Sequence, residues 1–390
     1  MLDSLPRGLL ALPQANDPHL PRILRKVRLL ALRRLLADPA PALGATLTHA
    51  RSVISASARR HSGAITAAVG HPDVLTPLLC REAGLLGAEE ALRLAMPAFL
   101  LELPAGVVGE AILWDQALPR LPGLAGGERG LVIDPSGHRI RGADGRNVAR
   151  EMAATLALPG GAHLTTLDPN PLSALEAHPE KRGNALDLAG HPPEEWCAKL
   201  SEALQLVADG LPGLAAELSL SLRRIVPVGF DAERHFSASY REAPGVAYLS
   251  LHPDPLTLAS AIVHETQHTK LNLIRRLDPL LVNSPDERVV SPIRPDERPV
   301  MGVLLAVHAF APVSALWLAL RAANHPVAGD PSFERRFEDI LLGNAEALAT
   351  LNSVGRPTAI GQRVISQLEA LHSAVRALST GDRFRYRPDG

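Results

Sequence analysis

The segment whose residue types and spacing are best suited to chemistry is His264-Glu265-Thr266-Gln267-His268. In a helix, residues four apart lie one above the other on the same face. His264 and His268 would therefore present two imidazoles to one metal ion without straining the backbone. Glu265 lies beside them and reaches the same space, as a general base or as a group that orients a ligand. The spacing predicts a metal site held by His264 and His268.

Two histidines do not complete such a site, because catalytic zinc and iron centres usually take three protein ligands and leave positions open. The next strongly helical segment is expected at Val300–Ala322, and His308 lies in it among apolar residues. An antiparallel placement of this helix against the motif helix would aim His308 at the ion, which makes it the best third ligand. Glu287, Glu297 and His252 are the substitutes.

A strand, a tight turn and a helix are expected to position the motif. Residues 245–251 have high β propensity, and Asp254 is a plausible N-cap with Pro255 at the first helical position. The helix should run to about Arg276. Apolar residues flank the motif, so the presence of two ionisable imidazoles in this helix requires a functional or structural explanation. The structural alternative is a pair of hydrogen-bonded core histidines. The flanking apolar residues are Leu258, Ile262, Val263, Leu271 and Ile274.

A charged segment, residues 286–299, links the two expected metal-bearing helices. Its three prolines and clustered charges favour a loop without regular structure. Arg294 and Arg298 lie in this loop and can form bidentate pairs with a carboxylate. They are therefore candidates to bind the distal carboxylate of a keto-acid cosubstrate. The alternative is a surface loop whose arginines pair with neighbouring acids.

The remaining pattern predicts an α+β, mainly helical protein, in which the metal-binding helix pair packs on a small mixed or antiparallel sheet. A Gly- and Pro-rich break after Trp114 divides a helical N-terminal region, residues 1–125, from a metal-dependent catalytic region, residues 126–390. Further helices are expected at residues 20–36, 52–69, 77–85, 89–101 and 193–211, and further strands at 130–134, 162–167 and 224–229.

Composition limits the function classes. A formal net charge of -1 gives no electrostatic argument for nucleic acid or for an anionic membrane as a partner. Aromatic residues make up only 3%, which disfavours a stacking platform for bases. Basic residues interrupt the apolar positions near the N-terminus, so no signal segment is expected. Two distant cysteines fit a reducing cytoplasm better than a disulfide framework.

Several stretches between about Arg223 and Trp317 resemble one family, the HExxH-type peptide β-hydroxylases found beside ribosomally made peptide precursors. The extended string His264-Glu-Thr-Gln-His-Thr-Lys-Leu271 is the most specific of them. The other stretches are Ser237–Ser239, Val246–Leu251, the run from Asp254 to Ala259, Asp278–Leu280, Arg294–Pro299 and Gly302–Phe310.

This resemblance implies a non-haem Fe(II) enzyme that consumes 2-oxoglutarate and O2 and hydroxylates a β-carbon in a precursor peptide. It implies that His264 and His268 bind the iron, and that the Arg298-Pro299 turn and the segment 302–310 belong to the active site. Members of the family often carry histidine where this sequence has Leu305 or Phe310. Here the histidine is His308, which shares a helical face with Leu305.

Two alternatives remain open. In a zinc metallopeptidase, the ion would activate a water molecule and Glu265 would take its proton as general base. In an iron oxygenase, Glu265 has no obligatory base role and can orient a ligand or the substrate. A non-catalytic peptide-binding protein would keep its partner when both motif histidines are exchanged.

Overall fold

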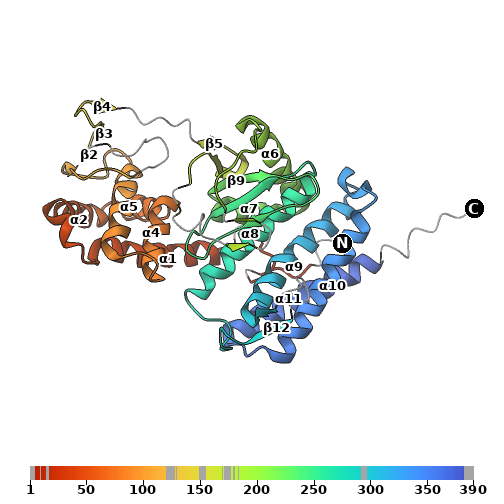
Figure 1. The fold of residues 1–390 in the computed structure, drawn as a ribbon. Helices are drawn as coiled ribbons and strands as arrows, with labels where there is room; N and C mark the ends of the chain where they lie inside the picture. Colours follow the sequence, from red (N-terminus) through yellow and green to blue (C-terminus); the bar gives the residue numbers. More distant parts are fainter. Residues whose placement is uncertain are drawn as a thin grey trace, which may run out of the picture.

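The structure is a computed structural model that describes residues 5–8, 10–14, 17–119, 128, 130–148, 155–168, 170, 177–178, 181–182, 184–290 and 297–381. Helices from the first hundred residues lie to one side of a central sheet, and the last helices lie on the other side (Figure 1). The motif helix lies between these two groups. The fold therefore places the HExxH segment in the middle of the molecule.

The N-terminal part is a helical layer with a small antiparallel sheet on it. Its strands follow the order β1-β2-β3-β4. Buried side chains from Leu20 to Ile140 form one hydrophobic core. The helices are α1 (His19–Ala37), α2 (Gly44–Ala58), α3 (Ser62–Val69), α4 (Pro72–Glu82) and α5 (Ala88–Leu101), with a 3-10 turn at Pro41–Leu43. The strands are β1 (Ile112–Trp114), β2 (Gly130–Asp134), β3 (Gly137–Arg141) and β4 (Asn147–Val148).

The central sheet is mixed, with the strand order β10-β11-β9-β6-β5. Strand β9 pairs in parallel with both β11 and β6, while the two edge strands pair antiparallel. Every residue of β11 is buried, so this strand lies in the interior of the protein. The strands are β5 (Thr155–Ala157), β6 (His163–Thr165), β9 (Arg224–Phe230), β10 (Ser237–Ala238) and β11 (Val246–Leu251). A separate short pair is β7 (Ala177–His178) with β8 (Lys181–Arg182).

Helices cover this sheet and build the larger core. The motif helix α8 (Pro255–Arg275) packs on β11 and on α9 (Val300–Ala322). Their buried apolar residues share one core with the segment 5–12 at the start of the chain. The other helices are α6 (Pro193–Gly210), α7 (Pro212–Ser221), α10 (Phe333–Val354) and α11 (Ala359–Gly381), with 3-10 turns at Pro159–Gly161 and Pro326–Gly329.

The expected fold class, α+β and mainly helical, is confirmed. Of the expected helix pair, α8 packs on the mixed sheet, while α9 packs on α8 and on β13. The expected loop across residues 286–299 is wrong at both ends. Strand β12 (Arg288–Val290) pairs antiparallel with β13 (Glu297–Pro299). Pro299 ends β13 and lies on a two-stranded ribbon, where a missing N–H is tolerated. The ribbon holds Arg298 in a strand directly before α9.

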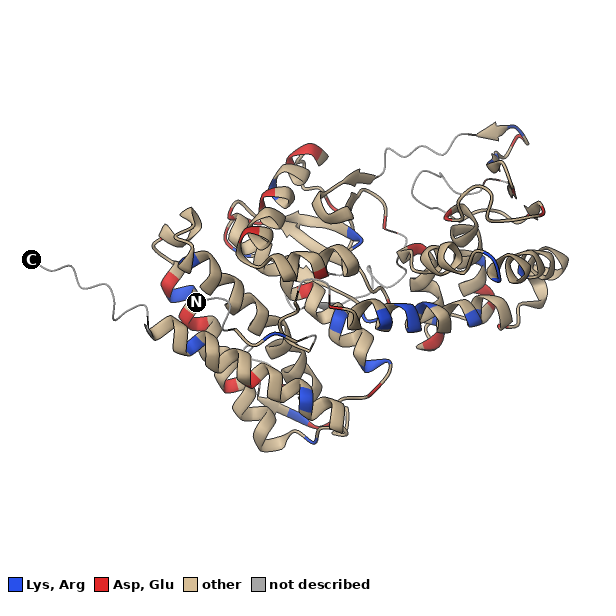
Figure 2. Ribbon diagram, turned by 180° about the vertical axis from the view of Figure 1, so that it is seen from behind, with Lys and Arg blue, Asp and Glu red and all other residues tan. Residues whose placement is uncertain are grey.

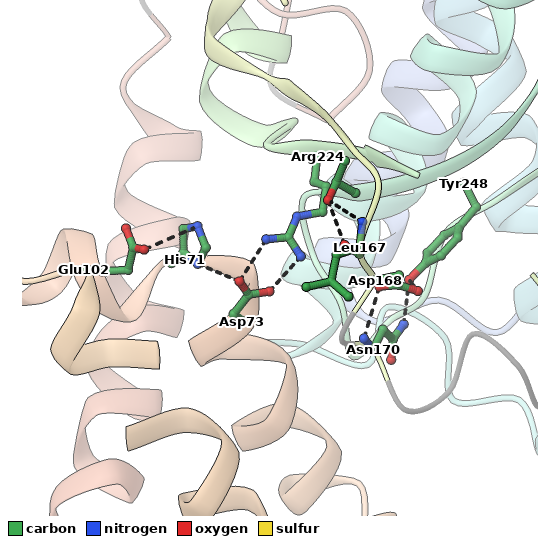
Figure 3. Close-up of polar contacts among 9 residues, drawn as sticks. His71, Asp73, Glu102, Leu167, Asp168, Asn170, Arg224 and Tyr248 are labelled. Atoms are coloured by element: carbon green, nitrogen blue, oxygen red, sulfur yellow. Dashed lines mark hydrogen bonds and ion pairs between the residues drawn. The ribbon is translucent and has the colours of Figure 1, made fainter. Parts of the chain in front are cut away.

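A buried ion pair joins the N-terminal helices to the central sheet. The two terminal nitrogens of Arg224, Nη1 and Nη2, on β9, donate to the carboxylate of Asp73, on α4, at 2.7 and 3.0 Å (Figure 3). His71 and Glu102 continue the contacts on the helical side. On the sheet side, the Tyr248 hydroxyl donates to Asp168 at 2.9 Å. This polar junction fixes how the two parts of the protein sit together.

The predicted boundary near residue 125 stays a prediction. The apolar side chains of β2 and β3 pack in the same core as α1 to α5. Of the described residues, only α9 forms a helix long and apolar enough to cross a membrane, and most of it is buried inside the protein. Such burial is typical of the core helix of a soluble protein. Basic residues, in blue, appear along α1 and near the end of α8 (Figure 2).

Candidate active site around His264 and His268

A capped turn sets the position of the motif helix. The Asp254 carboxylate accepts hydrogen bonds from the backbone N–H of Leu256 at 2.9 Å and from the Thr257 hydroxyl at 2.7 Å. Arg336, on α10, donates to the same carboxylate at 2.8 Å. The N-cap predicted at Asp254 is thus confirmed, with Pro255 in the first turn. The cap and the ion pair fix the start of α8 against the last helices.

The two motif histidines lie face to edge on one side of α8. Their ring centroids are 4.4 Å apart, and the ring planes meet at 81°. Both rings are half-buried, and the Nδ1 atom of each is buried without a hydrogen-bond partner. A pair of hydrogen-bonded core histidines is therefore not what the structure contains. Two imidazoles with unpaired nitrogens are suited to binding a metal ion.

Burial lowers the pKa of both imidazoles. For His264 the second cause is the neighbouring charge of His268, followed by that of His235. For His268, the carboxylate of Glu265 opposes the effect of burial, and the guanidinium of Arg298 adds to it. Since a metal ligand must be the neutral imidazole, these shifts keep the lone pairs available at neutral pH.

Two serines hold the carboxylate of Glu265. The Ser237 hydroxyl donates to one oxygen and the Ser239 hydroxyl donates to the other, each at 2.6 Å. Ser237 lies on β10, at the edge of the sheet, and Ser239 follows that strand. The Glu265 side chain is 3% exposed. The sheet therefore fixes the orientation of Glu265 beside the histidine pair.

The opposite side of α8 carries a buried charge network. Lys270 is fully buried, and its ammonium lies 3.1 Å from a carboxylate oxygen of Glu217, on α7. Gln267 donates to the same carboxylate at 2.7 Å, and Lys270 also donates to the backbone carbonyl of Ala11 at 3.2 Å. This network ties the motif helix to α7 and to the N-terminal segment.

The structure does not bring His308 into a group with the histidine pair. His308 is fully buried on α9, and neither ring nitrogen has a hydrogen-bond partner. It lies beside the backbone of Leu10 and Gln267, and it is close enough to Lys270 and to His268 that their charges affect it. Among the described residues, no group of three or more His, Cys, Asp or Glu side chains is arranged to bind a metal ion. A third ligand at His308 stays a prediction.

The substitute ligands lie in other contacts. Glu287 pairs with Arg356 at 2.6 Å, and Glu297 is exposed on β13. The Nδ1 atom of His252 accepts a hydrogen bond from the backbone N–H of Asp254 at 3.0 Å. Arg294 lies outside the described residues. Of the expected ligands, only His264 and His268 lie together among the described residues, which therefore fit a metal ion only in part.

Three further side chains surround the pair. The ring of Phe310 lies 4.5 Å from the ring of His264, centroid to centroid. His235 is close enough that its charge affects His264, and Arg298 is close enough that its charge affects His268. The resemblance marked Arg298 and the segment that contains Phe310, and the structure brings both to the pair. His235 and the anchoring role of the two serines were not foreseen.

Stability of the metal-free protein should fall in acid. The pKa of His308 is lowered well below its usual value by burial and then by the charges of Lys270 and His268. The unfolded chain binds protons near pH 6.5, whereas the native state binds them only at lower pH. The free energy of unfolding should therefore fall by about 1.4 kcal/mol per pH unit for each such histidine, as the pH drops below about 6.

Urea unfolding of the metal-free protein at about pH 7.5 and about pH 5.5 measures this loss. His308→Leu removes one titrating group without a hydrogen-bond partner, so its loss between the two pH values should be smaller. An equal loss in both proteins would show that His308 does not contribute.

No protein-family model matches the sequence, and no curated protein sequence matches it. The resemblance of residues 223–317 to the peptide β-hydroxylases stays a prediction, and the argument for function depends on the site itself.

Proposed function

We propose that this protein is a non-haem Fe(II), 2-oxoglutarate-dependent enzyme that hydroxylates a β-carbon in a ribosomally made peptide, in the cytoplasm. The proposal is supported by the resemblance around the motif and by two neutral imidazoles with unpaired nitrogens on one face of α8. The bound iron would activate O2 together with the keto acid. His264 and His268 supply its nitrogen ligands.

The hydrogen bonds and burial of Glu265 bear on the choice between an iron oxygenase and a zinc peptidase. A zinc peptidase needs this carboxylate to accept a proton from the activated water. Here a serine hydroxyl engages each oxygen at 2.6 Å, and the side chain is buried. Such an anchored carboxylate suits a group that orients its neighbours. This arrangement favours the oxygenase over the peptidase.

Arg298 is the cation best placed for the cosubstrate. Its charge lowers the pKa of His268 after the larger effect of burial, so the guanidinium lies near the pair. A dicarboxylate that reaches the metal with one end needs a cation at its distal end. The ribbon of β12 and β13 holds Arg298 directly before α9.

The Glu265→Gln variant tests the proposed function. An amide keeps the shape of the side chain and one oxygen that accepts a hydrogen bond, so we expect the iron-loaded enzyme to keep activity within about 10-fold. A zinc peptidase that lost its general base would lose about 10²–10⁴-fold. The assay follows formation of succinate from 2-oxoglutarate and the gain of one oxygen in a pool of synthetic peptides, by mass spectrometry.

Ser237→Ala combined with Ser239→Ala is the companion variant, because it frees the carboxylate without removing it. A moderate loss of hydroxylation is expected if Glu265 acts by orienting its neighbours. Cleavage of the peptides by the zinc-loaded protein, without 2-oxoglutarate, would overturn the proposal.

A further inference from the structure

A cavity of about 700 Å³ opens along α8, one to two turns beyond the histidine pair. It lies between the end of α4, the last turns of α8 and the start of α9. Asn272 and Arg275 line it, four and seven residues after His268, so the cavity continues along the face of α8 that carries the histidines. Pro299, Gly302 and Leu305 form the wall on the α9 side. The remaining lining residues include Glu82, Arg241, Arg276, Leu281 and Asn283.

Three guanidinium groups meet in this cavity. Arg275 and Arg276 come from the end of α8, and Arg241 comes from the segment that follows Ser239. Burial lowers the pKa of Arg275 and of Arg276, and the charge of Arg241 lowers both further. The carboxylate of Glu242 opposes this for both arginines, and that of Glu82 opposes it for Arg276. Arg241 thus repels both arginines of α8 in a partly buried place, and the lowered pKa of each shows that the neighbouring carboxylates do not fully compensate. Such an arrangement destabilises the free protein and is relieved by an anion.

The neighbouring acidic residues occupy only some of the N–H donors of these arginines. Arg276 lies 3.6 Å from Glu82, which also pairs with Arg34, and the Nε atom of Arg276 is buried without a hydrogen-bond partner. Arg241 donates to Glu242 at 2.9 Å, while 49% of its side chain is exposed.

Arg275 makes one side-chain hydrogen bond among the described residues, to the amide oxygen of Asn272 at 2.9 Å. Several N–H groups therefore remain for a ligand.

We propose that the cavity lined by Arg241, Arg275 and Arg276 binds the carboxylate of an acidic side chain in the peptide that reaches His264 and His268. The proposal rests on the proposed function, because it names a feature of that peptide. Planar guanidinium groups match a carboxylate with paired hydrogen bonds. The described lining contains one acidic residue, Glu82, against three arginines, so its net positive charge favours an anion.

The distance along α8 from the histidines to the arginines also predicts how far the acidic residue lies from the modified position in the peptide. Seven residues of helix separate His268 from Arg275, which corresponds to about 10 Å along the axis. An extended peptide covers this length with about three residues. An aspartate or glutamate about three residues from the modified position would therefore reach the arginines. A free dicarboxylate would fill only part of a cavity of this volume.

Binding of short peptides to the metal-free protein tests the inference without any turnover. The probes are a fluorescein-labelled glycine–serine peptide with two aspartates and its twin with two asparagines, followed by fluorescence anisotropy at low salt. We expect the aspartate peptide to bind at least about 10-fold more tightly, since hydrogen bonds to charged groups are the strong ones. Arg275→Gln should weaken its binding about 10-fold.

Arg335→Gln is the matched control, because Arg335 is exposed on α10 and lies outside the cavity. It should leave the affinity unchanged, and circular dichroism verifies that both variants fold. Equal binding of the two peptides, or no effect of Arg275→Gln, would overturn the inference. Tighter binding of succinate than of the aspartate peptide would assign the cavity to a free dicarboxylate and would also overturn it.

These outcomes are independent of the proposed chemistry. A protein that binds the aspartate peptide but forms no succinate with Fe(II) and 2-oxoglutarate would contradict the proposed function and leave the carboxylate site intact. A protein that hydroxylates peptides regardless of their acidic residues would contradict the site alone.

Discussion

Asp73→Ala should lower the free energy of unfolding by about 3–5 kcal/mol, because it leaves the guanidinium of Arg224 buried without its main counter-charge. Asp73 and Arg224 are 4% and 5% exposed. Burial alone would lower the pKa of Arg224, but the Asp73 carboxylate, with smaller contributions from Asp168 and Tyr248, outweighs this and raises it. Removal of the carboxylate therefore exposes the full cost of the buried charge. Urea unfolding, followed by circular dichroism, measures the loss.

Glu89→Ala is the matched control for a surface ion pair. Glu89 and Arg93 are four residues apart on α5, 2.9 Å from each other, and both are exposed. Such pairs contribute about 0.3–0.5 kcal/mol. The double variant Asp73→Leu with Arg224→Met removes both charges and should recover most of the lost stability. A loss below about 1 kcal/mol for Asp73→Ala would show that the junction contributes little.

His264→Ala and His268→Ala should each weaken metal binding more than about a hundredfold. Loss of a group that only orients a ligand already costs about 10–100-fold, and these residues would supply the ligand atoms themselves. Competition with a chromophoric chelator, with zinc as the probe, measures the affinity without any turnover. His19→Ala is the control, because His19 is exposed on α1.

Phe310→His tests the same site by adding a possible third metal ligand. Its ring lies 4.5 Å from His264, so a histidine there would bring a third imidazole to the pair. We expect zinc to bind more tightly to this variant. Unchanged affinity in His264→Ala and His268→Ala would place the ion elsewhere in the protein.

Local patterns predicted the motif helix well. Asp254 and Pro255 define its start through a cap that depends on adjacent residues only. The apolar run of Val300–Ala322 predicted α9 with the bounds that the structure has. Both elements depend on short-range spacing, which a single sequence contains. The histidine pair follows from the same kind of spacing.

Contacts between distant residues could not be predicted in this way. Arg224 and Asp73 are 151 residues apart in the chain, and Lys270 and Glu217 are 53 apart. Neither pair leaves a periodic signal. The expectation of an irregular loop at residues 286–299 was wrong for a related reason, because strand pairing between the two ends of this segment outweighs the effect of its prolines. Ser237 belongs to one of the stretches that resemble the peptide β-hydroxylases, but only the fold brings its hydroxyl to Glu265.

The burial of Leu5 and of residues 10–12 has a consequence for the order in which the protein forms during synthesis. Leu5, Leu10 and Leu12 are buried in the core built by residues 158–375. Gly8 lies so close to Gln367 of α11 that an added Cβ would come within 2.6 Å of its side-chain oxygen. This early segment can therefore complete its packing only after α11, which follows it far along the chain, has been synthesised. The N-terminal helices α1 to α5 can form their own core long before this closure.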